Sequence, residues 1–167
     1  MDDSLVLDDA SASRFSVLLG RHVGIIHKVV ATYCRDRDDR ADLAQEITAN
    51  AWQAFPRYDA TRPFPTWLFR IALNVAISHV RSAVRRQGRH VPFDEEIHDT
   101  VAGHALNDAL VTFGRAVAHL DPLNKALLVL YLDDYSHREI AEVLGISESN
   151  VGTKLSRLKE RITDELV

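Results

Sequence analysis

The chain has 167 residues, of which 46% are hydrophobic and 26% are charged, a composition typical of a folded protein and not of a disordered one. Its apolar runs fall short of the roughly 20 residues that cross a bilayer, and its acidic first residues differ from a secretory signal, so we expect a cytoplasmic protein without membrane insertion. The formal net charge of −4 argues against a protein that binds nucleic acid unaided, because such binding depends on neutralising phosphates.

Two helical patterns come first in the chain. From Phe15 to Tyr33, apolar residues recur at steps of three and four, which indicates one buried stripe. From Asp39 to Phe55, apolar residues such as Leu43 and Ile47 share one side of a second helix. The opposite side is polar and carries Asp42, Gln45, Glu46 and Gln53. That side is available to a partner, although a polar stripe is also the default for any helix that faces water.

The third helical pattern is rich in arginine. Pro56 ends the second helix, and we predict an ordered loop from Arg57 to Pro65, because proline fixes φ and bars helix continuation. From Thr66 to about Arg86 no proline or glycine interrupts the chain, which predicts a helix about 31 Å long at about 1.5 Å per residue. Residues 60–93 contain no Asp or Glu and six arginines, namely Arg62, Arg70, Arg81, Arg85, Arg86 and Arg89. This segregation of charge indicates a polyanion-binding segment, with a solvated helix end as the alternative.

Residues 88–105 show no sustained period and contain Pro92, Gly103 and an acidic run, which is typical of a flexible acidic linker. We therefore predict two small helical domains on either side of it, residues 1–87 and residues 106–167. Nothing in the sequence alternates with a period of two over the length of a strand, so the predicted fold class is all-α.

The second domain contains clear helix-start signals. Apolar residues in 106–120 repeat at steps of four and three, which predicts a helix. Asp121 followed by Pro122 is an N-cap with proline at the first helical position of the next helix. Ser136 and Glu139 have the spacing of a capping box, in which a hydroxyl and a carboxylate satisfy the exposed N–H groups of a helix start.

A helix-turn-helix is predicted just after this capping box. Gly145 suits a left-handed C-cap and Ser147 offers a second N-cap after one intervening residue, so two helices meet at a tight turn. Ala141, Gly145 and Val151 supply the small residue at the crossing, the glycine in the turn and the apolar anchor that this motif needs. The polar residues on or beside the outward face of its second helix are Ser149, Asn150, Thr153, Lys154, Ser156 and Arg157. They can reach a major groove, and a plain helical hairpin with a solvated face is the alternative.

These motifs resemble those of the extracytoplasmic-function (ECF) sigma factors, the minimal two-domain members of the sigma-70 family. The resemblance covers nearly the whole chain and is carried by Asp42 to Glu46 with Trp52, by Pro65 to Asn74, and by Tyr135 to Ala141. It implies a sigma factor that binds core RNA polymerase and directs promoter recognition and melting for transcription initiation. The partners that it implies are the beta-prime clamp and beta flap of the polymerase, promoter DNA and an anti-sigma factor.

The resemblance also implies a role for each surface. The clamp would be bound by Asp42, Gln45, Glu46 and Gln53. The minus-ten element, with a base flipped from the non-template strand, would be bound by Tyr58, Arg70, Asn74, Arg81, Arg85 and Arg86. The minus-thirty-five element would be bound by Ser149, Asn150, Thr153, Lys154, Ser156 and Arg157. A purely structural role, with Tyr58 and Trp67 in the core and Asn74 as a surface amide, is the alternative for the minus-ten set.

The chain departs from the family pattern at two places. The sequence Asp39-Arg40-Ala41-Asp42 stands where relatives commonly have a more acidic run, so the predicted docking face is less negative than usual. Gly152 and Thr153 replace the Arg or Lys and the Ser that are common in the recognition helix. The promoter sequence therefore cannot be transferred from relatives.

Two other classes of function compete with this interpretation. A stand-alone helix-turn-helix regulator would bind duplex DNA without polymerase and use the first domain as a sensor or dimeriser. An enzyme would need a catalytic motif, but none of the eight histidines lies in an H-E-x-x-H helix, and the sequence has no nucleophile elbow or glycine-rich phosphate loop. Cys34 is the single cysteine, which excludes an internal disulfide and disfavours a thiolate metal site. We therefore expect a protein that is not an enzyme and needs no cofactor or metal.

Overall fold

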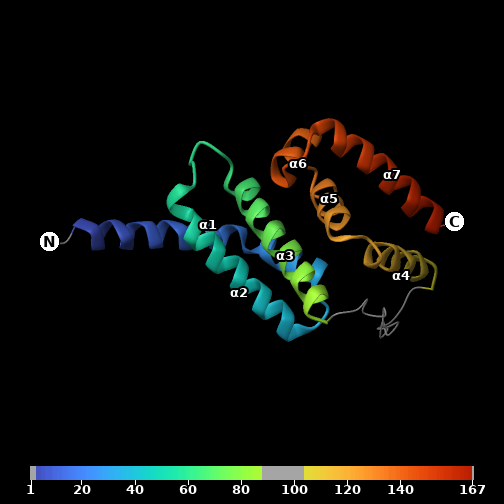
Figure 1. Ribbon diagram of the computed structural model, residues 1–167, viewed down its shortest axis with the longest axis horizontal. Helices are drawn as coiled ribbons and strands as arrows, with labels where there is room; N and C mark the ends of the chain where they lie inside the picture. Colours follow the sequence, from blue (N-terminus) through green and yellow to red (C-terminus); the bar gives the residue numbers. More distant parts are fainter. Residues whose placement is uncertain (1–2, 88–103, 167) are drawn as a thin grey trace. The chain divides into compact units, whose positions relative to one another are not determined.

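The computed structural model describes residues 3–87 and 104–166, and every regular element in these two ranges is a helix (Figure 1). The predicted all-α fold class is therefore confirmed. The predicted linker, residues 88–105, lies outside the described residues except for its last two. The elements are α1 (Asp3–Tyr33), α2 (Arg37–Ala54), the short 3₁₀ helix η1 (Phe55–Arg57), α3 (Phe64–Gln87), α4 (His104–Ala118), α5 (Pro122–Leu132), α6 (His137–Leu144) and α7 (Glu148–Leu166).

The chain divides into two compact units, Met1–Val80 and Arg81–Val167. The division falls within α3, which continues as one helix through Val80 to Gln87. The predicted boundaries at residues 87 and 106 stay predictions.

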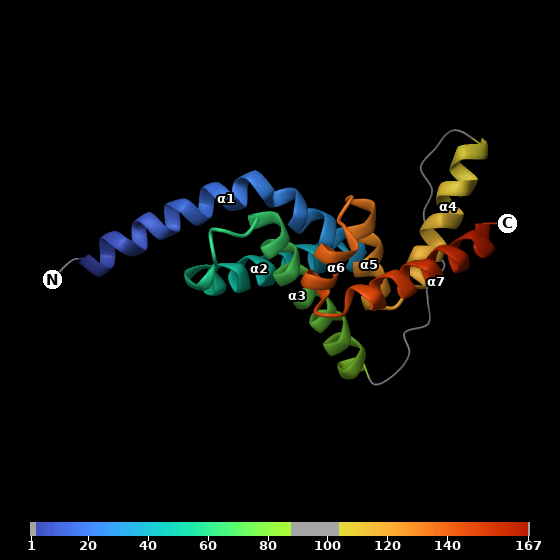
Figure 2. The same ribbon diagram turned by 90° about the horizontal axis from the view of Figure 1, so that it is seen from above.

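The core of the first unit is built from one side of each of its three α-helices. α1 packs against α2 (Figure 2), whose Leu43 and Ile47 have no exposed surface, as the sequence pattern predicts. Leu68 and Phe69 of α3 are buried to the same extent, with exposed fractions of 0% and 1%. Burying large apolar side chains is the main stabilising contribution to such a unit. The polar sides of α2 and α3 are therefore left to face solvent or a partner.

α1 is longer than predicted and is kinked. The apolar stripe predicts a helix from Phe15, but α1 begins at Asp3. Its backbone leaves the helical region at His22, where φ is −122° and ψ is 15°. The His22 ring lies 5.5 Å from the Phe64 ring at the start of α3, so the kink lies at a tertiary contact.

The loop before α3 is shorter than predicted. Phe55–Arg57, where the second helix was predicted to end and the loop to begin, is 3₁₀ helix, and α3 begins at Phe64 with Pro65 inside its first turn. Proline is tolerated there because the N–H groups of a first turn have no partner within the helix. Cys34 follows the end of α1 and is buried, and that burial raises the pKa of its thiol.

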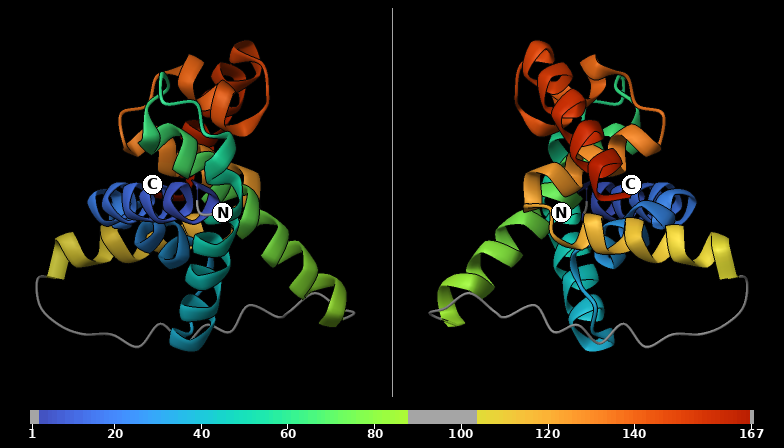
Figure 3. Two further views of the ribbon diagram at one scale, coloured as in Figure 1. Left: turned by 90° about the vertical axis from the view of Figure 1, so that its left-hand side faces the viewer. Right: turned by 90° about the vertical axis from the view of Figure 1, so that its right-hand side faces the viewer.

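In the second unit, α4, α5 and α6 each pack against α7, and α5 also packs against α6 (Figure 3). Its core is formed mainly by leucine and β-branched residues that are at most 2% exposed, namely Leu127, Leu130, Ile140, Val143, Val151 and Leu155. Because α6 and α7 both contribute to this core, the angle between the two short helices is set by packing as well as by the turn.

The predicted caps of the second unit are all present. Ser136 Oγ accepts the Glu139 N–H at 3.3 Å, and a Glu139 carboxylate oxygen accepts the Ser136 N–H at 2.8 Å, which completes the capping box. Gly145 has the left-handed φ of +67° that a C-cap glycine supplies. Ser147 Oγ accepts the Asn150 N–H at 3.1 Å, and Asp121 caps α5. The helix-turn-helix is thus fixed by local bonds at both sides of its turn.

The capping box predicts a pH-dependent stability. Ser136→Ala is expected to lower the free energy of unfolding by about 1 kcal/mol at neutral pH, because it removes an N-cap acceptor. Hydrogen bonds from the Ser136 hydroxyl and N–H hold the pKa of Glu139 below its ordinary 4.5. A lowered folded-state pKa stabilises the fold above the ordinary value, and this contribution is lost as the pH falls through the folded-state pKa. The difference between the two proteins should therefore shrink in acid, as measured by thermal unfolding followed by far-ultraviolet circular dichroism. An equal difference at every pH would contradict the role of Glu139.

Candidate functional site

An aromatic cluster holds the loop between η1 and α3. The Tyr58 ring stacks on Phe55 with 5.8 Å between centroids and an angle of 18°, and it lies 4.9 Å from Trp67 and 5.5 Å from Phe64. The Tyr58 hydroxyl donates a hydrogen bond of 2.6 Å to the Arg62 carbonyl oxygen. Tyr58 and Trp67 are half-buried, so each belongs to the cluster and still exposes part of its ring.

The turn after Tyr58 is stabilised by a carboxylate. Asp59 Oδ1 accepts hydrogen bonds from the Thr61 N–H at 3.0 Å and from the Thr61 hydroxyl at 2.7 Å. These bonds lower the pKa of Asp59, because they stabilise its ionised carboxylate. The loop therefore presents Tyr58 in one defined position.

A groove of about 590 Å³ lies between this loop and the first half of α1. Tyr58 and Ala60 line it from the loop side, and α1 contributes Ala10, Ser13, Arg14, Val17 and Leu18. Its size falls in the usual range of ligand sites, about 300–1,000 Å³. Sequence reasoning placed Tyr58 at a binding site but missed the α1 wall, because no local pattern links residues 10–18 to residue 58.

The polar residues predicted on α3 share one face, with one exception. Arg70, Asn74, Arg81 and Arg85 are exposed, and their spacings of four and seven residues keep them on one side of the helix. Arg86 is exposed on a different side, where its Nε donates a long hydrogen bond of 3.4 Å to the Ser82 carbonyl oxygen. The structure thus groups four of the five predicted α3 contacts along a single cationic face.

Tyr58 and Asn74 do not lie at the same point of this surface. Trp67, which touches Tyr58, precedes Asn74 by seven residues, or about 10 Å along α3 at about 1.5 Å per residue. A strand of several nucleotides could contact them in turn.

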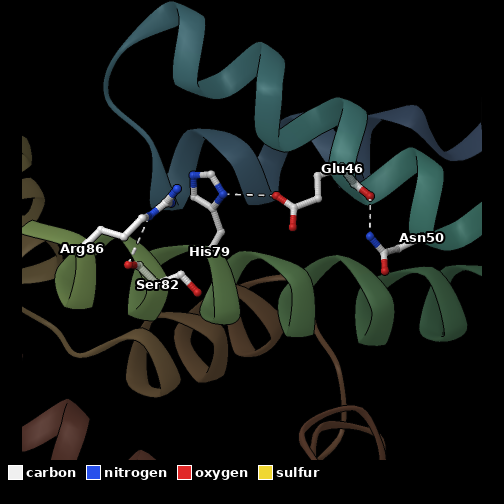
Figure 4. A network of polar contacts seen from close by, with 5 residues as sticks. All are labelled: Glu46, Asn50, His79, Ser82 and Arg86. Carbon is white, nitrogen blue, oxygen red and sulfur yellow. Dashed lines mark hydrogen bonds and ion pairs between the residues drawn. The ribbon is translucent and has the colours of Figure 1, made fainter.

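The predicted docking face of α2 is exposed, and one of its members is held by α3. Asp42, Gln45, Glu46 and Gln53 are all exposed on one side of the helix. Glu46 Oε2 lies 3.2 Å from His79 Nδ1, with side-chain exposures of 48% and 24% (Figure 4). Sequence reasoning did not identify His79, because the two residues are 33 positions apart and neither stands in a motif with the other.

The recognition helix α7 presents a polar face opposite its core side. Val151, Leu155 and Leu158 are buried, whereas the outward residues Ser149, Asn150, Thr153, Ser156 and Arg157 are exposed. Lys154, at the edge of this face, is less exposed than the others and is half-buried. The Thr153 hydroxyl donates a 3.1 Å hydrogen bond to the Ser149 carbonyl, so its methyl group and its oxygen lone pair remain for a ligand.

Two neighbours of this face have structural contacts. A Cβ on Gly152 would lie 3.8 Å from the His137 ring, so this glycine stands where α7 passes close to α6. Lys159 Nζ lies 4.4 Å from the centroid of the Tyr131 ring, which links α7 to α5 by a cation–π contact. Neither of these two contacts involves Thr153 or Arg157, which lie at the centre of the exposed polar face.

Comparison with known proteins identifies both units. Residues 18–86 match the model of Sigma-70 region 2, and residues 110–162 match that of Sigma-70, region 4. The ECF RNA polymerase sigma factor SigW of Bacillus subtilis is 30% identical over 142 residues, which cover 75% of this chain and 74% of the relative. The RNA polymerase sigma factor CnrH of Cupriavidus metallidurans is 27% identical over 163 residues, which cover 89% of this chain and 84% of the relative.

Solved structures agree with this assignment. The sigma factor RpoE of Bartonella quintana, in complex with the anti-sigma factor NepR, matches with a TM-score of 0.74 and 20% identity, covering 92% of this chain and 96% of its own, and so supports the fold. CnrH in complex with the cytosolic domain of CnrY matches with a TM-score of 0.64 and 26% identity over 96% and 95% of the two chains. None of the helices within residues 3–87 and 104–166 has the length and apolar character needed to cross a membrane. The chain thus belongs to the ECF sigma factors of the sigma-70 family and is an RNA polymerase sigma factor.

Proposed function

We propose that this sigma factor opens the minus-ten element at the groove beside Tyr58 and along the cationic face of α3. The groove is the observation that carries the proposal, because it places a fixed, partly exposed aromatic ring next to an open space. Unstacking a base costs a few kcal/mol, and stacking on an aromatic ring returns about 1–3 kcal/mol per base. Tyr58 supplies that ring for the flipped base of the non-template strand.

The residues of α3 act on the rest of the strand. Asn74 lies about 10 Å beyond the Tyr58 contact and reads a different nucleotide from the one that Tyr58 stacks upon. Arg70, Arg81 and Arg85 follow the same face and neutralise phosphates, which is the main source of affinity for nucleic acid. Arg86, on another side of the helix, contacts a different part of the DNA backbone.

The polar face of α2 binds the polymerase. Asp42, Gln45, Glu46 and Gln53 form a continuous exposed surface that docks on the beta-prime clamp, and the second unit docks on the beta flap. His79 restrains Glu46 within this surface. A restrained side chain loses less conformational entropy on binding, so this pair favours docking.

The exposed face of α7 reads the minus-thirty-five element in the major groove. Arg157 has the planar fork that pairs bidentately with guanine, and the Thr153 methyl group suits contact with thymine. The flanking residues that complete the surface are Ser149, Asn150, Lys154 and Ser156. The acidic chain as a whole binds DNA poorly until the polymerase positions both units.

The solved relatives support a proposal about regulation. RpoE is in complex with the anti-sigma factor NepR and CnrH is in complex with the cytosolic domain of CnrY, and we infer that an anti-sigma factor also restrains this chain. The protein works in the cytoplasm, as a binding subunit that performs no chemistry of its own. This agrees with a site made of docking and DNA-contact residues.

Run-off transcription with purified core polymerase tests this function. The wild-type chain should direct a specific transcript, and Asp42→Arg should strongly reduce it together with core binding in a pull-down, because a reversed charge is placed on the docking face. The matched control is Asp164→Arg, which reverses an exposed acid on α7 beyond the region-four match. Failure of the wild-type chain to yield a specific transcript at any responsive promoter, or tight promoter binding without polymerase, would favour a stand-alone regulator.

A further inference from the structure

One helix of this acidic protein contains only positive formal charges over most of its length. Residues 10–35 contain no Asp or Glu. They contain four cations, Arg14, Arg21, Lys28 and Arg35, which stand seven residues apart. In a chain whose net charge is −4, such a segment concentrates positive potential on one element.

The three cations within α1 form an exposed stripe. Arg14, Arg21 and Lys28 are all exposed, and a spacing of seven residues keeps Arg14 and Arg21 on nearly the same side of the helical segment before the kink at His22. Val17, which lies between Arg14 and Arg21, and Gly24, which lies between Arg21 and Lys28, are exposed too. We call Arg14, Arg21 and Lys28 the α1 cationic stripe. Arg14 and Arg21 precede the kink at His22 and Lys28 follows it, so the stripe bends with the helix.

The stripe begins at the groove beside Tyr58. Arg14 lines that groove, and its guanidinium carbon lies 5.9 Å from the centroid of the Phe55 ring. This contact fixes the arginine at the edge of the aromatic cluster that holds Tyr58. A strand that leaves the groove on this side passes Arg14 first and then meets Arg21, two turns along the helix.

The spacing of the stripe fits a phosphate backbone. Seven residues correspond to about 10 Å of helix at about 1.5 Å per residue. A stacked strand advances about 3.4 Å per nucleotide, so successive cations face about every third phosphate. We propose that the α1 cationic stripe binds the phosphate backbone of the promoter strand that leaves the Tyr58 groove. This inference rests on the proposed function of that groove and adds a second DNA path beside the face of α3.

The proposal is tested with the holoenzyme and fork-junction DNA from a promoter that it transcribes. In the short DNA, the single strand ends at the minus-ten element. In the extended DNA, the single strand continues beyond this element on either side. Arg21→Gln should weaken binding of the extended DNA and leave binding of the short DNA unchanged. The slope of log affinity against log salt should fall by about 0.7 for each lost single-strand phosphate contact, and Arg14→Gln combined with Arg21→Gln should double that change.

Arg37→Gln is the matched control, because Arg37 is exposed in the acidic first turn of α2 and does not belong to the stripe. Its salt slope should equal that of the wild-type holoenzyme. An unchanged slope in the stripe variants overturns the proposal, as does a loss of core-polymerase binding, which would assign the stripe to an acidic protein surface. Both results are distinct from a failure of the proposed function, in which even the wild-type holoenzyme would not bind the short DNA.

Discussion

Replacing Phe55 by alanine is expected to lower the free energy of unfolding of the first unit by about 3–5 kcal/mol. The Phe55 ring is 6% exposed and contacts Phe15 at 5.1 Å, Tyr58 at 5.8 Å and Trp67 at 6.2 Å. Alanine leaves a cavity where three helical segments and the loop meet. Since domains are stable by only about 5–15 kcal/mol, much of the unit's stability would be lost.

Tryptophan fluorescence during urea unfolding measures this change without interference from the second unit. The chain has two tryptophans, Trp52 and Trp67, and both lie in the first unit. Phe55→Leu should lose less, because it retains most of the buried volume. Val23→Ala, at a position 41% exposed on α1, should stay within about 0.5 kcal/mol of the wild-type protein. A loss for Phe55→Ala as small as that of Val23→Ala would show that the ring is not central to the cluster.

The functional consequence of this change separates folding from DNA opening. At a temperature where the Phe55→Ala unit remains folded, Tyr58 has lost the ring on which it stacks. Its position beside the groove is then less defined, so promoter opening should fall more than binding to core polymerase. Equal losses in the two assays would assign the whole effect to stability.

The sequence predicts best those features that depend on neighbours within one turn of helix. The capping box of Ser136 and Glu139, the left-handed Gly145 and the N-cap Ser147 each need only residues up to three positions away. The buried side of α2 follows in the same way from helical periodicity. These local signals were sufficient to predict the helices, the turn and the outward face of α7.

The features that the sequence does not predict depend on contacts between distant segments. The groove joins residues 10–18 to Tyr58, and the pair of Glu46 and His79 joins α2 to α3. The kink at His22 lies beside Phe64, 42 positions later, so the apolar period alone predicts a straight helix. Propensity and period contain no information on such pairings, which tertiary packing decides.

Charge patterns give an intermediate case. The arginines of α3 are visible as an acid-free run, and helical spacing already separates the face of Arg70, Arg81 and Arg85 from the side of Arg86, but the structure shows that they are exposed. The cations of α1 are equally visible in sequence, yet their relation to a binding site depends on the contact of Arg14 with the groove. A charged segment thus indicates a class of partner before it indicates a place for it.

Arg157→Ala is expected to weaken binding of the holoenzyme to its minus-thirty-five element by about 1–3 kcal/mol, the range for one bidentate base contact. That corresponds to about 5- to 150-fold in affinity. Arg157 is exposed on α7, one turn after Thr153, at the centre of the polar face. Arg157→Lys should recover little of the loss, because an ammonium group lacks the planar fork.

The matched control for this prediction is Arg161→Ala, one turn further along α7, where Arg161 Nε lies 3.4 Å from Glu165 Oε1. An exposed pair of this kind contributes about 0–1 kcal/mol to stability, so the control should keep the fold. Because Arg161 lies outside the predicted contact residues, the control should also change promoter affinity little. The decisive measurement is affinity for a set of minus-thirty-five elements that differ at single base pairs. If Arg157 reads guanine, Arg157→Ala should weaken the preferred sequence and equalise the variants at one position. A uniform weakening of all sequences, with a smaller salt slope, would instead make Arg157 a phosphate contact and would leave sequence reading to Thr153 and its neighbours.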